Sequence, residues 1–144
     1  MIPGFRPLFA AVFREAFLRW AEAGEGMISF DFVDGPSDAD IVCKWNANML
    51  KYKNSAEPAQ TNLYSDSRGL AKGEIEILTM SPLTNQAVTE KRMRGTMLHE
   101  VGHVLGLTGH TGNPGDIMFN WFNLRDNPED LSEQDKNALT RLYK

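Results

Sequence analysis

The chain has 144 residues, of which 42% are hydrophobic and 24% are charged, and its net charge is −4. This length suits one domain with a single buried core, and the composition is typical of globular proteins. The acidic balance argues against a nucleic-acid-binding surface, which needs clustered lysine and arginine. No apolar run approaches the roughly 20 residues that a membrane span needs, and the first residues do not form a signal peptide.

The first third of the chain is predicted to hold one helix and two strands. Apolar side chains recur every three or four positions over residues 7–23, which predicts an amphipathic helix that ends at Gly24 and Gly26. Residues 27–33 (MISFDFV) alternate between apolar and polar side chains, as in a half-buried strand, and residues 39–45 (ADIVCKW) predict a second strand.

The middle of the chain is predicted to be a polar loop followed by a strand. Residues 46–73 are rich in Asn, Ser and Gly, with a short strand expected at 61–64. Residues 73–79 (GEIEILT) alternate, with Ile75 and Ile77 on one face and glutamates on the other. Charged side chains on one face suit a strand at or near a sheet edge.

The last third is predicted to contain two helices joined by an irregular segment. A helix is expected from about residue 89 to 107, and residues 108–130 carry several glycines and prolines. Ser132 caps a final helix, with Asp135 at the third position of a capping box. The order of elements predicts an α+β fold with a small mixed sheet rather than alternating βαβ units.

A histidine-rich stretch, HEVGHVLGLTGH at residues 99–110, contains all three histidines of the chain. His99 and His103 are four residues apart, so on a helix they share one face and can bind one metal ion. Glu100 lies beside them and can reach a water molecule on that metal, while Gly106 can end the helix. The alternative is a coincidental core helix, because H-E-x-x-H alone is only moderately specific.

The spacing of the third histidine departs from the longer pattern H-E-x-x-H-x-x-G-x-x-H, because His110 follows one residue later. A catalytic zinc site wants three protein ligands and an open position. We expect a one-residue bulge in which Gly109 adopts a positive φ, so that His110 completes the site. The competing reading makes His110 an ordinary loop residue and Asp116 the third ligand.

The motif resembles the metzincin clan of zinc peptidases, and within it the matrixin-like bacterial members. The matching residues are His99, Glu100, His103, Gly106 and, one place late, His110. Residues 116–119 (DIMF) look like the Met-turn of the clan, with Met118 as its methionine, and residues 39–42 and the last helix also agree.

The resemblance implies a zincin/metzincin-like α+β fold with an N-terminal helix, an active-site helix and a C-terminal helix. It implies one catalytic domain over residues 1–144. Residues 1–106 would form an N-terminal subdomain with the sheet and the active-site helix. Residues 107–144 would form a C-terminal subdomain with the Met-turn and the last helix.

The function implied is that of a zinc metalloendopeptidase. His99, His103 and His110 would hold one catalytic Zn²⁺ with a water molecule in the open position. Glu100 would act as general base and pass the proton to the leaving amine. The substrate would be a protein or peptide. We expect a monomer without nucleic-acid or membrane partners, secreted by analogy with the family.

The resemblance also implies a substrate strand that runs antiparallel to an edge strand, for which residues 73–79 are the candidate. Ile75 and Ile77 on that strand, and Phe119, Trp121 and Phe122 beyond the Met-turn, are candidates for the substrate pocket. Core packing is the alternative for each of them. A calcium site in the 46–73 loop, through Asp66 or backbone carbonyls, is left open. Cys43 is expected to be a buried, inert thiol.

Two other functions are considered. Bacterial RNA-maturation nucleases also place three histidines on and after a helix, but Glu100, Met118 and the acidic charge argue against this class. A non-catalytic binding domain with a relic zinc site is the second alternative, and the intact His/Glu/His core argues against it.

Overall fold

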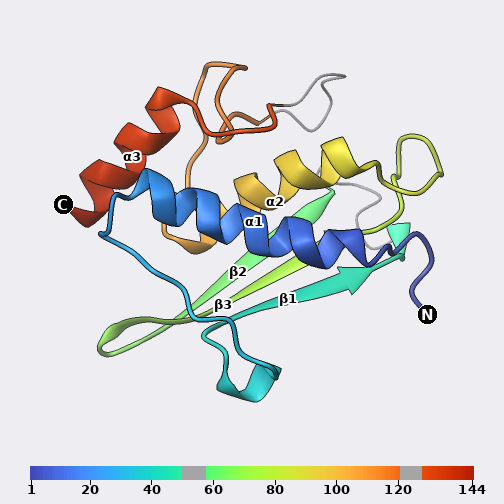
Figure 1. The fold of residues 1–144 in the computed structure, drawn as a ribbon, viewed down its shortest axis with the longest axis horizontal. Coiled ribbons are helices and arrows are strands. Elements are labelled where there is room, and N and C mark those ends of the chain that lie inside the picture. The colour runs from blue at the N-terminus through green and yellow to red at the C-terminus, as the bar shows by residue number, and fades with distance from the viewer. Residues whose placement is uncertain (50–57, 121–127) are drawn as a thin grey trace.

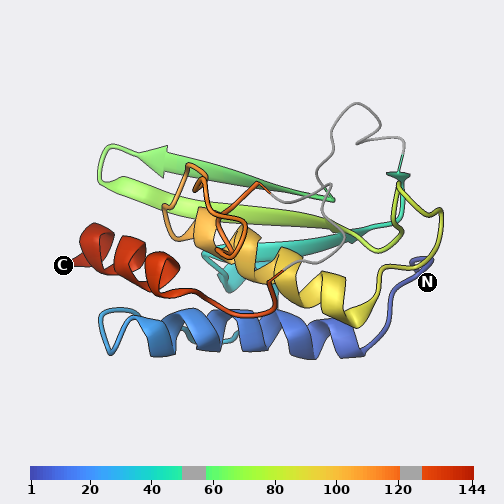
Figure 2. The same ribbon diagram turned by 90° about the horizontal axis from the view of Figure 1, so that it is seen from above.

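The computed structural model describes residues 1–49, 58–120 and 128–144 of the chain. The described elements follow the order α1 (Leu8–Ala23), η1 (Pro36–Asp38), β1 (Ile41–Asn46), β2 (Ala59–Asp66), β3 (Gly69–Leu78), α2 (Glu90–Val104) and α3 (Glu133–Tyr143). Helix α2 lies between the sheet and α1, and it contacts α1, β2 and β3 (Figures 1 and 2). The predicted α+β fold, with three helices and a small mixed sheet, is confirmed.

The sheet has the order β1-β3-β2, with β1 parallel to β3 and β2 antiparallel to it. The prediction that residues 73–79 form the edge strand is therefore wrong, because β3 is paired on both sides. Sequence alternation describes the two faces of a strand and says nothing about its lateral neighbours. Ile75 and Ile77 are 0% and 1% exposed, so they belong to the core rather than to a substrate pocket.

The helix predicted at residues 7–23 is confirmed as α1, and its apolar face is buried. The buried residues of α1 are Phe9, Val12, Ala16, Phe17 and Trp20. The indole Nε1–H of Trp20 donates to the carbonyl oxygen of Leu98 at 2.9 Å. This bond satisfies the one polar atom of a fully buried side chain, and it fixes α1 against the middle of α2.

The sheet and the C-terminal half of α2 approach each other closely at Gly73 of β3. A Cβ atom at this position would collide with the side chain of Val104. Because Gly73 has no side chain, α2 can pack directly on β3, and this contact sets the distance between the helix and the sheet.

The strand predicted at residues 27–33 is absent, although the alternation that suggested it is real. Ile28, Phe30 and Phe32 are half-buried and the residues between them are exposed. Phe30 packs on Phe17 of α1, with ring centroids 4.9 Å apart. Within the described part of the chain, no backbone hydrogen bond pairs residues 28–33 with another segment. The alternation therefore reports burial against α1, not pairing in a sheet.

The two helices of the C-terminal half begin at capping side chains. Thr89 accepts a hydrogen bond from the Arg92 amide at 3.2 Å. Ser132 and Asp135 form the predicted capping box at the start of α3. None of the helices in the described ranges is long and apolar enough to cross a membrane.

Candidate metal centre

Helix α2 ends in a turn that sends the chain back towards its own histidines. The Gly106 amide donates to the His103 carbonyl and the Leu107 amide donates to the Gly102 carbonyl, both at 3.0 Å. This pair of bonds is the Schellman motif, which requires a left-handed residue, and Gly106 has φ +110°. The prediction that Gly106 ends the active-site helix is confirmed.

The turn brings all three histidines together. One ring nitrogen from each of His99, His103 and His110 lies within 4.8 Å of the other two. The ring centroids are 4.6 Å apart for His99 and His103, 5.2 Å for His99 and His110, and 5.1 Å for His103 and His110. His99 is buried, His103 is half-buried and His110 is exposed. The cluster is therefore closed on the side of the core and open towards solvent at His110.

The late position of His110 is accommodated differently from our prediction. Gly109 does not have a positive φ, and a Cβ atom there would meet nothing within 4 Å. The left-handed residue is Gly106, so the reversal is complete before Gly109, and the remaining residues span the distance without strain. Asp116, the alternative ligand, is not part of the cluster, and its Oδ1 accepts a hydrogen bond from the Ser132 hydroxyl at 2.7 Å.

Two backbone carbonyls orient the histidine rings. Nδ1 of His99 donates to the Ile117 carbonyl at 2.6 Å, and Nδ1 of His103 donates to the Leu107 carbonyl at 2.7 Å. Because a carbonyl can only accept, these bonds place the proton on Nδ1 and leave Nε2 as the donor atom for a metal. In metal sites, the second ring nitrogen of a histidine ligand commonly donates such a hydrogen bond.

Burial keeps these two imidazoles neutral. Desolvation lowers the pKa of His99 to about 3, against the smaller opposing effect of the Ile117 hydrogen bond. Desolvation also lowers the pKa of His103. Neutral imidazole is the form that binds metal, and a set of three histidines suits zinc. The donor set, together with the tautomer and protonation state of His99 and His103, therefore fits a zinc ion.

Glu100 follows His99 on α2 and is 2% exposed. The Thr61 hydroxyl, on β2, donates a hydrogen bond to the Glu100 carboxylate. Sequence reasoning missed Thr61, because no local pattern marks a residue that reaches the site from a strand far away in the chain. Only the pairing of β2 with β3, which sets Thr61 opposite Ile75, reveals it.

Met118 packs against α2 at Gly102, the residue before His103. A Cβ atom on Gly102 would collide with the Met118 sulfur and would lie 3.0 Å from Cζ2 of Trp20. Met118 is 3% exposed, and its carbonyl accepts from the Thr111 amide at 2.9 Å. The methionine thus packs against the helix backbone at Gly102, which has no side chain to exclude it.

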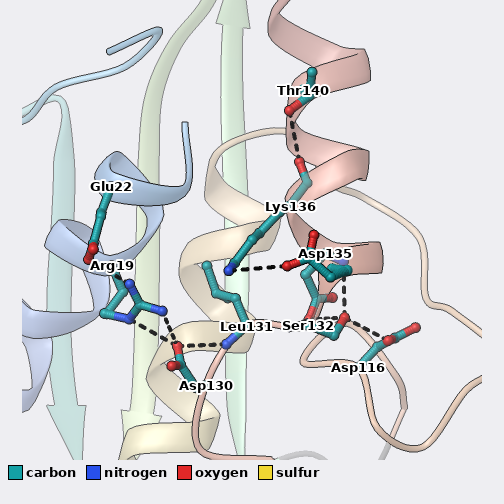
Figure 3. A network of polar contacts seen from close by, with 10 residues as sticks. Arg19, Glu22, Asp116, Asp130, Leu131, Ser132, Asp135, Lys136 and Thr140 are labelled. Carbon is teal, nitrogen blue, oxygen red and sulfur yellow. Dashed lines mark hydrogen bonds and ion pairs between the residues drawn. The ribbon is translucent and has the colours of Figure 1, made fainter. Parts of the chain in front are cut away.

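Helix α3 holds the segment that carries Met118. The carboxylate of Asp135 is fully buried and accepts from the amides of Ile117 at 2.8 Å and Met118 at 3.2 Å. Ser132, which caps α3, also reaches Asp116 (Figure 3). A carboxylate that accepts several buried N–H groups is a strong anchor. Ile117 therefore links α3 to the histidine cluster, because its amide donates a hydrogen bond to Asp135 and its carbonyl accepts one from His99.

The remaining predictions concern a substrate pocket and a calcium site. Phe119 is half-buried next to Met118, while Trp121 and Phe122 lie outside the described residues. The calcium prediction is not supported. Asp66 pairs with Arg68 at 3.0 Å. Across residues 1–49, 58–120 and 128–144, the three histidines are the sole group of three or more His, Cys, Asp or Glu side chains placed to hold one metal ion.

The fold and the histidine cluster together define a metzincin-like α+β domain. The family model of the matrixins matches residues 6–144, almost the whole chain. The chain belongs to the matrixin family, which implies a zinc peptidase acting on proteins or peptides. No curated protein matches the chain.

Proposed function

We propose that the protein is a zinc-dependent endopeptidase whose ion is held by Nε2 of His99, His103 and His110. The observation that carries the proposal is the convergence of three ring nitrogens within 4.8 Å, two of them with their tautomer fixed by backbone carbonyls. When bound, zinc supplies Lewis-acid chemistry, which acidifies water and polarises a carbonyl group.

Glu100 is the proposed general base. Its carboxylate is buried next to the metal ligands, where it can accept a proton from the attacking water and deliver it to the leaving amine. The Thr61 hydroxyl holds one carboxylate oxygen, which restricts the rotation of the side chain. The second oxygen is then oriented for proton transfer.

The substrate is proposed to bind along β2 rather than along residues 73–79. In the part of the chain that is described, β2 is an edge strand that pairs with β3 alone. An extended peptide can add to such an edge through main-chain hydrogen bonds. Because Thr61 belongs to β2 and contacts Glu100, a peptide on this edge lies beside the general base. Phe119 remains a candidate for the wall of a side-chain pocket.

The test combines zinc analysis with cleavage of a quenched fluorescent peptide. Glu100→Ala should retain zinc and lose activity by about 10² to 10⁴-fold, which is the usual contribution of a general base. His110→Ala should lose both zinc and activity. Gly109→Ala is the matched control, since there is open space around that position.

Proteolysis that persists in Glu100→Ala would remove this residue from the mechanism. Zinc retained at full stoichiometry in His110→Ala would exclude the three-histidine site. Cleavage of RNA without cleavage of peptides would assign the chain to the nuclease alternative.

A further inference from the structure

The peptide group between Ile117 and Met118 is hydrogen-bonded at both of its ends. Its carbonyl oxygen accepts from Nδ1 of His99 at 2.6 Å. Its N–H, which belongs to Met118, donates to Oδ1 of Asp135 at 3.2 Å. The two ends of a peptide group are electronically connected, because the C–N bond has partial double-bond character. Asp135 of α3 is therefore joined to a proposed metal ligand of α2 through a single peptide group.

The carboxylate of Asp135 lies in the interior, where its charge acts at full strength on its neighbours. The residue is 0% exposed. Its other oxygen, Oδ2, accepts from the amides of Ile117 at 2.8 Å and of Ser132 at 2.9 Å (Figure 3). In a buried chain of hydrogen bonds each bond polarises the next, and a charged acceptor strengthens the effect. The Asp135 carboxylate therefore makes the Ile117 carbonyl a stronger acceptor for His99.

The other helical histidine lacks this connection. Nδ1 of His103 donates to the Leu107 carbonyl at 2.7 Å. The N–H of that peptide group belongs to Thr108, and it makes no backbone hydrogen bond within the described ranges. His99 and His103 thus have the same kind of acceptor, but a buried carboxylate polarises only the acceptor of His99. This asymmetry provides an internal comparison within one molecule.

We propose that Asp135 is a positioning residue of the metal centre, which acts on His99 through the peptide group of Ile117 and Met118. The polarised carbonyl attracts the Nδ1 proton of His99, which fixes the plane of the ring and raises the electron density at Nε2, the proposed metal-binding atom. This role rests on the proposed function, because it takes His99 as a zinc ligand. Its consequence is tighter zinc binding than three unassisted histidines would give.

The Asp135→Asn variant separates this role from simple anchoring of α3. The side-chain carbonyl of asparagine should take the place of Oδ2, where two amides need an acceptor, and its NH₂ group should then face the Met118 amide. The variant keeps two backbone contacts and removes the one that leads to His99. The dissociation constant for zinc, measured by competition with a chelator, should rise about 10–100-fold, the usual loss when the support of a metal ligand is removed.

Ser132→Ala is the matched control, because it weakens the same end of α3. It removes the hydroxyl that caps the helix and contacts Asp116 and Asp135. The contact between Oδ1 of Asp135 and the Met118 amide stays intact. Because global stability and the zinc affinity of the folded state are separate quantities, Ser132→Ala should bind zinc as tightly as the wild type where both are folded. Equal weakening in the two variants would reduce Asp135 to an anchor and overturn the proposal.

Nuclear magnetic resonance of the zinc-loaded wild type gives a readout that needs no variant. The Nδ1 protons of His99 and His103 are distinguished by their proximity to Ile117 and Leu107. The His99 proton should resonate further downfield, because its hydrogen bond is the stronger one. In Asp135→Asn it should move upfield while the His103 proton stays in place. A wild-type spectrum without the downfield His99 proton would overturn the positioning role, even if every variant failed to fold.

Two results separate this role from the proposed function. A wild-type protein that binds no zinc would overturn both of them. Zinc bound by the wild type, with an unchanged dissociation constant in Asp135→Asn, would overturn the positioning role alone and leave the three-histidine site standing.

Discussion

Thr61 and Glu100 are separated by 39 residues in the sequence, and the hydroxyl of the first donates a hydrogen bond to the carboxylate of the second. The bond joins an edge strand to the helix that bears two of the proposed metal ligands. The segment proposed to bind substrate and the residue proposed to move the proton are therefore coupled by one side-chain contact.

Replacing Thr61 tests this coupling. Thr61→Val keeps the β-branched shape and removes the hydroxyl, so kcat should fall about tenfold because the carboxylate becomes free to rotate. KM and zinc content should change little. Thr61→Ser restores the hydroxyl and should recover most of the activity. Equal kcat values for Thr61→Val and Thr61→Ser would show that the hydrogen bond to Glu100 has no role in turnover.

Asp135 should be a principal stabilising residue of the C-terminal half. Asp135→Ala leaves the buried amides of Ile117 and Met118 without their acceptor and removes the bond from the Ser132 amide in the capping box of α3. We expect the free energy of unfolding in urea to fall by about 3 kcal/mol. The control is Asp130→Ala, which removes an exposed ion pair with Arg19 and should cost less than about 1 kcal/mol. Equal losses in the two variants would contradict the anchoring role.

Gly102 should tolerate a side chain only when Met118 is made smaller. Alanine favours a helix over glycine by about 1 kcal/mol, but here its methyl group would collide with the Met118 sulfur and crowd Trp20. Overpacking of this kind costs about 1–3 kcal/mol, so Gly102→Ala should be destabilising. In a Met118→Ala background the same substitution should cost at least about 1 kcal/mol less. Strictly additive effects in this double-mutant cycle would exclude the contact.

Cys43 should make the folded protein sensitive to high pH. Burial raises the pKa of its thiol from 9.0 to about 12. The folded state therefore holds the proton more tightly than the unfolded state, and this contribution is complete below pH 9 and is lost as the pH rises towards 12. The unfolding free energy of the wild type should fall more steeply over that range than that of Cys43→Ala. Parallel pH curves for the two proteins would argue against a buried thiol.

The helices could be predicted from the sequence because their signals are local. Apolar spacing marks α1, and side-chain caps mark the starts of α2 and α3. The residues 99–110 likewise carry a local metal motif. Lateral strand order is not local, which is why the sequence patterns wrongly predict that β3 lies at the edge and that residues 27–33 form a strand.

The support around the histidines was also hidden from sequence reasoning. The Ile117 carbonyl, the Asp135 carboxylate and the Thr61 hydroxyl reach the site from three different segments. Each is an ordinary residue type in an unremarkable stretch. Its role appears only when tertiary packing brings the segments together.

The closeness of the three histidines in the chain has a consequence for how zinc affects folding. Residues 99–110 form a short loop even in the unfolded ensemble, and closing a short loop costs little entropy. We therefore expect the denatured chain to retain some affinity for zinc, so that added metal would stabilise the native state by less than the native affinity alone would give. The gap between the affinity of a free 96–112 peptide and that of the intact protein measures how much preorganisation the surrounding fold contributes.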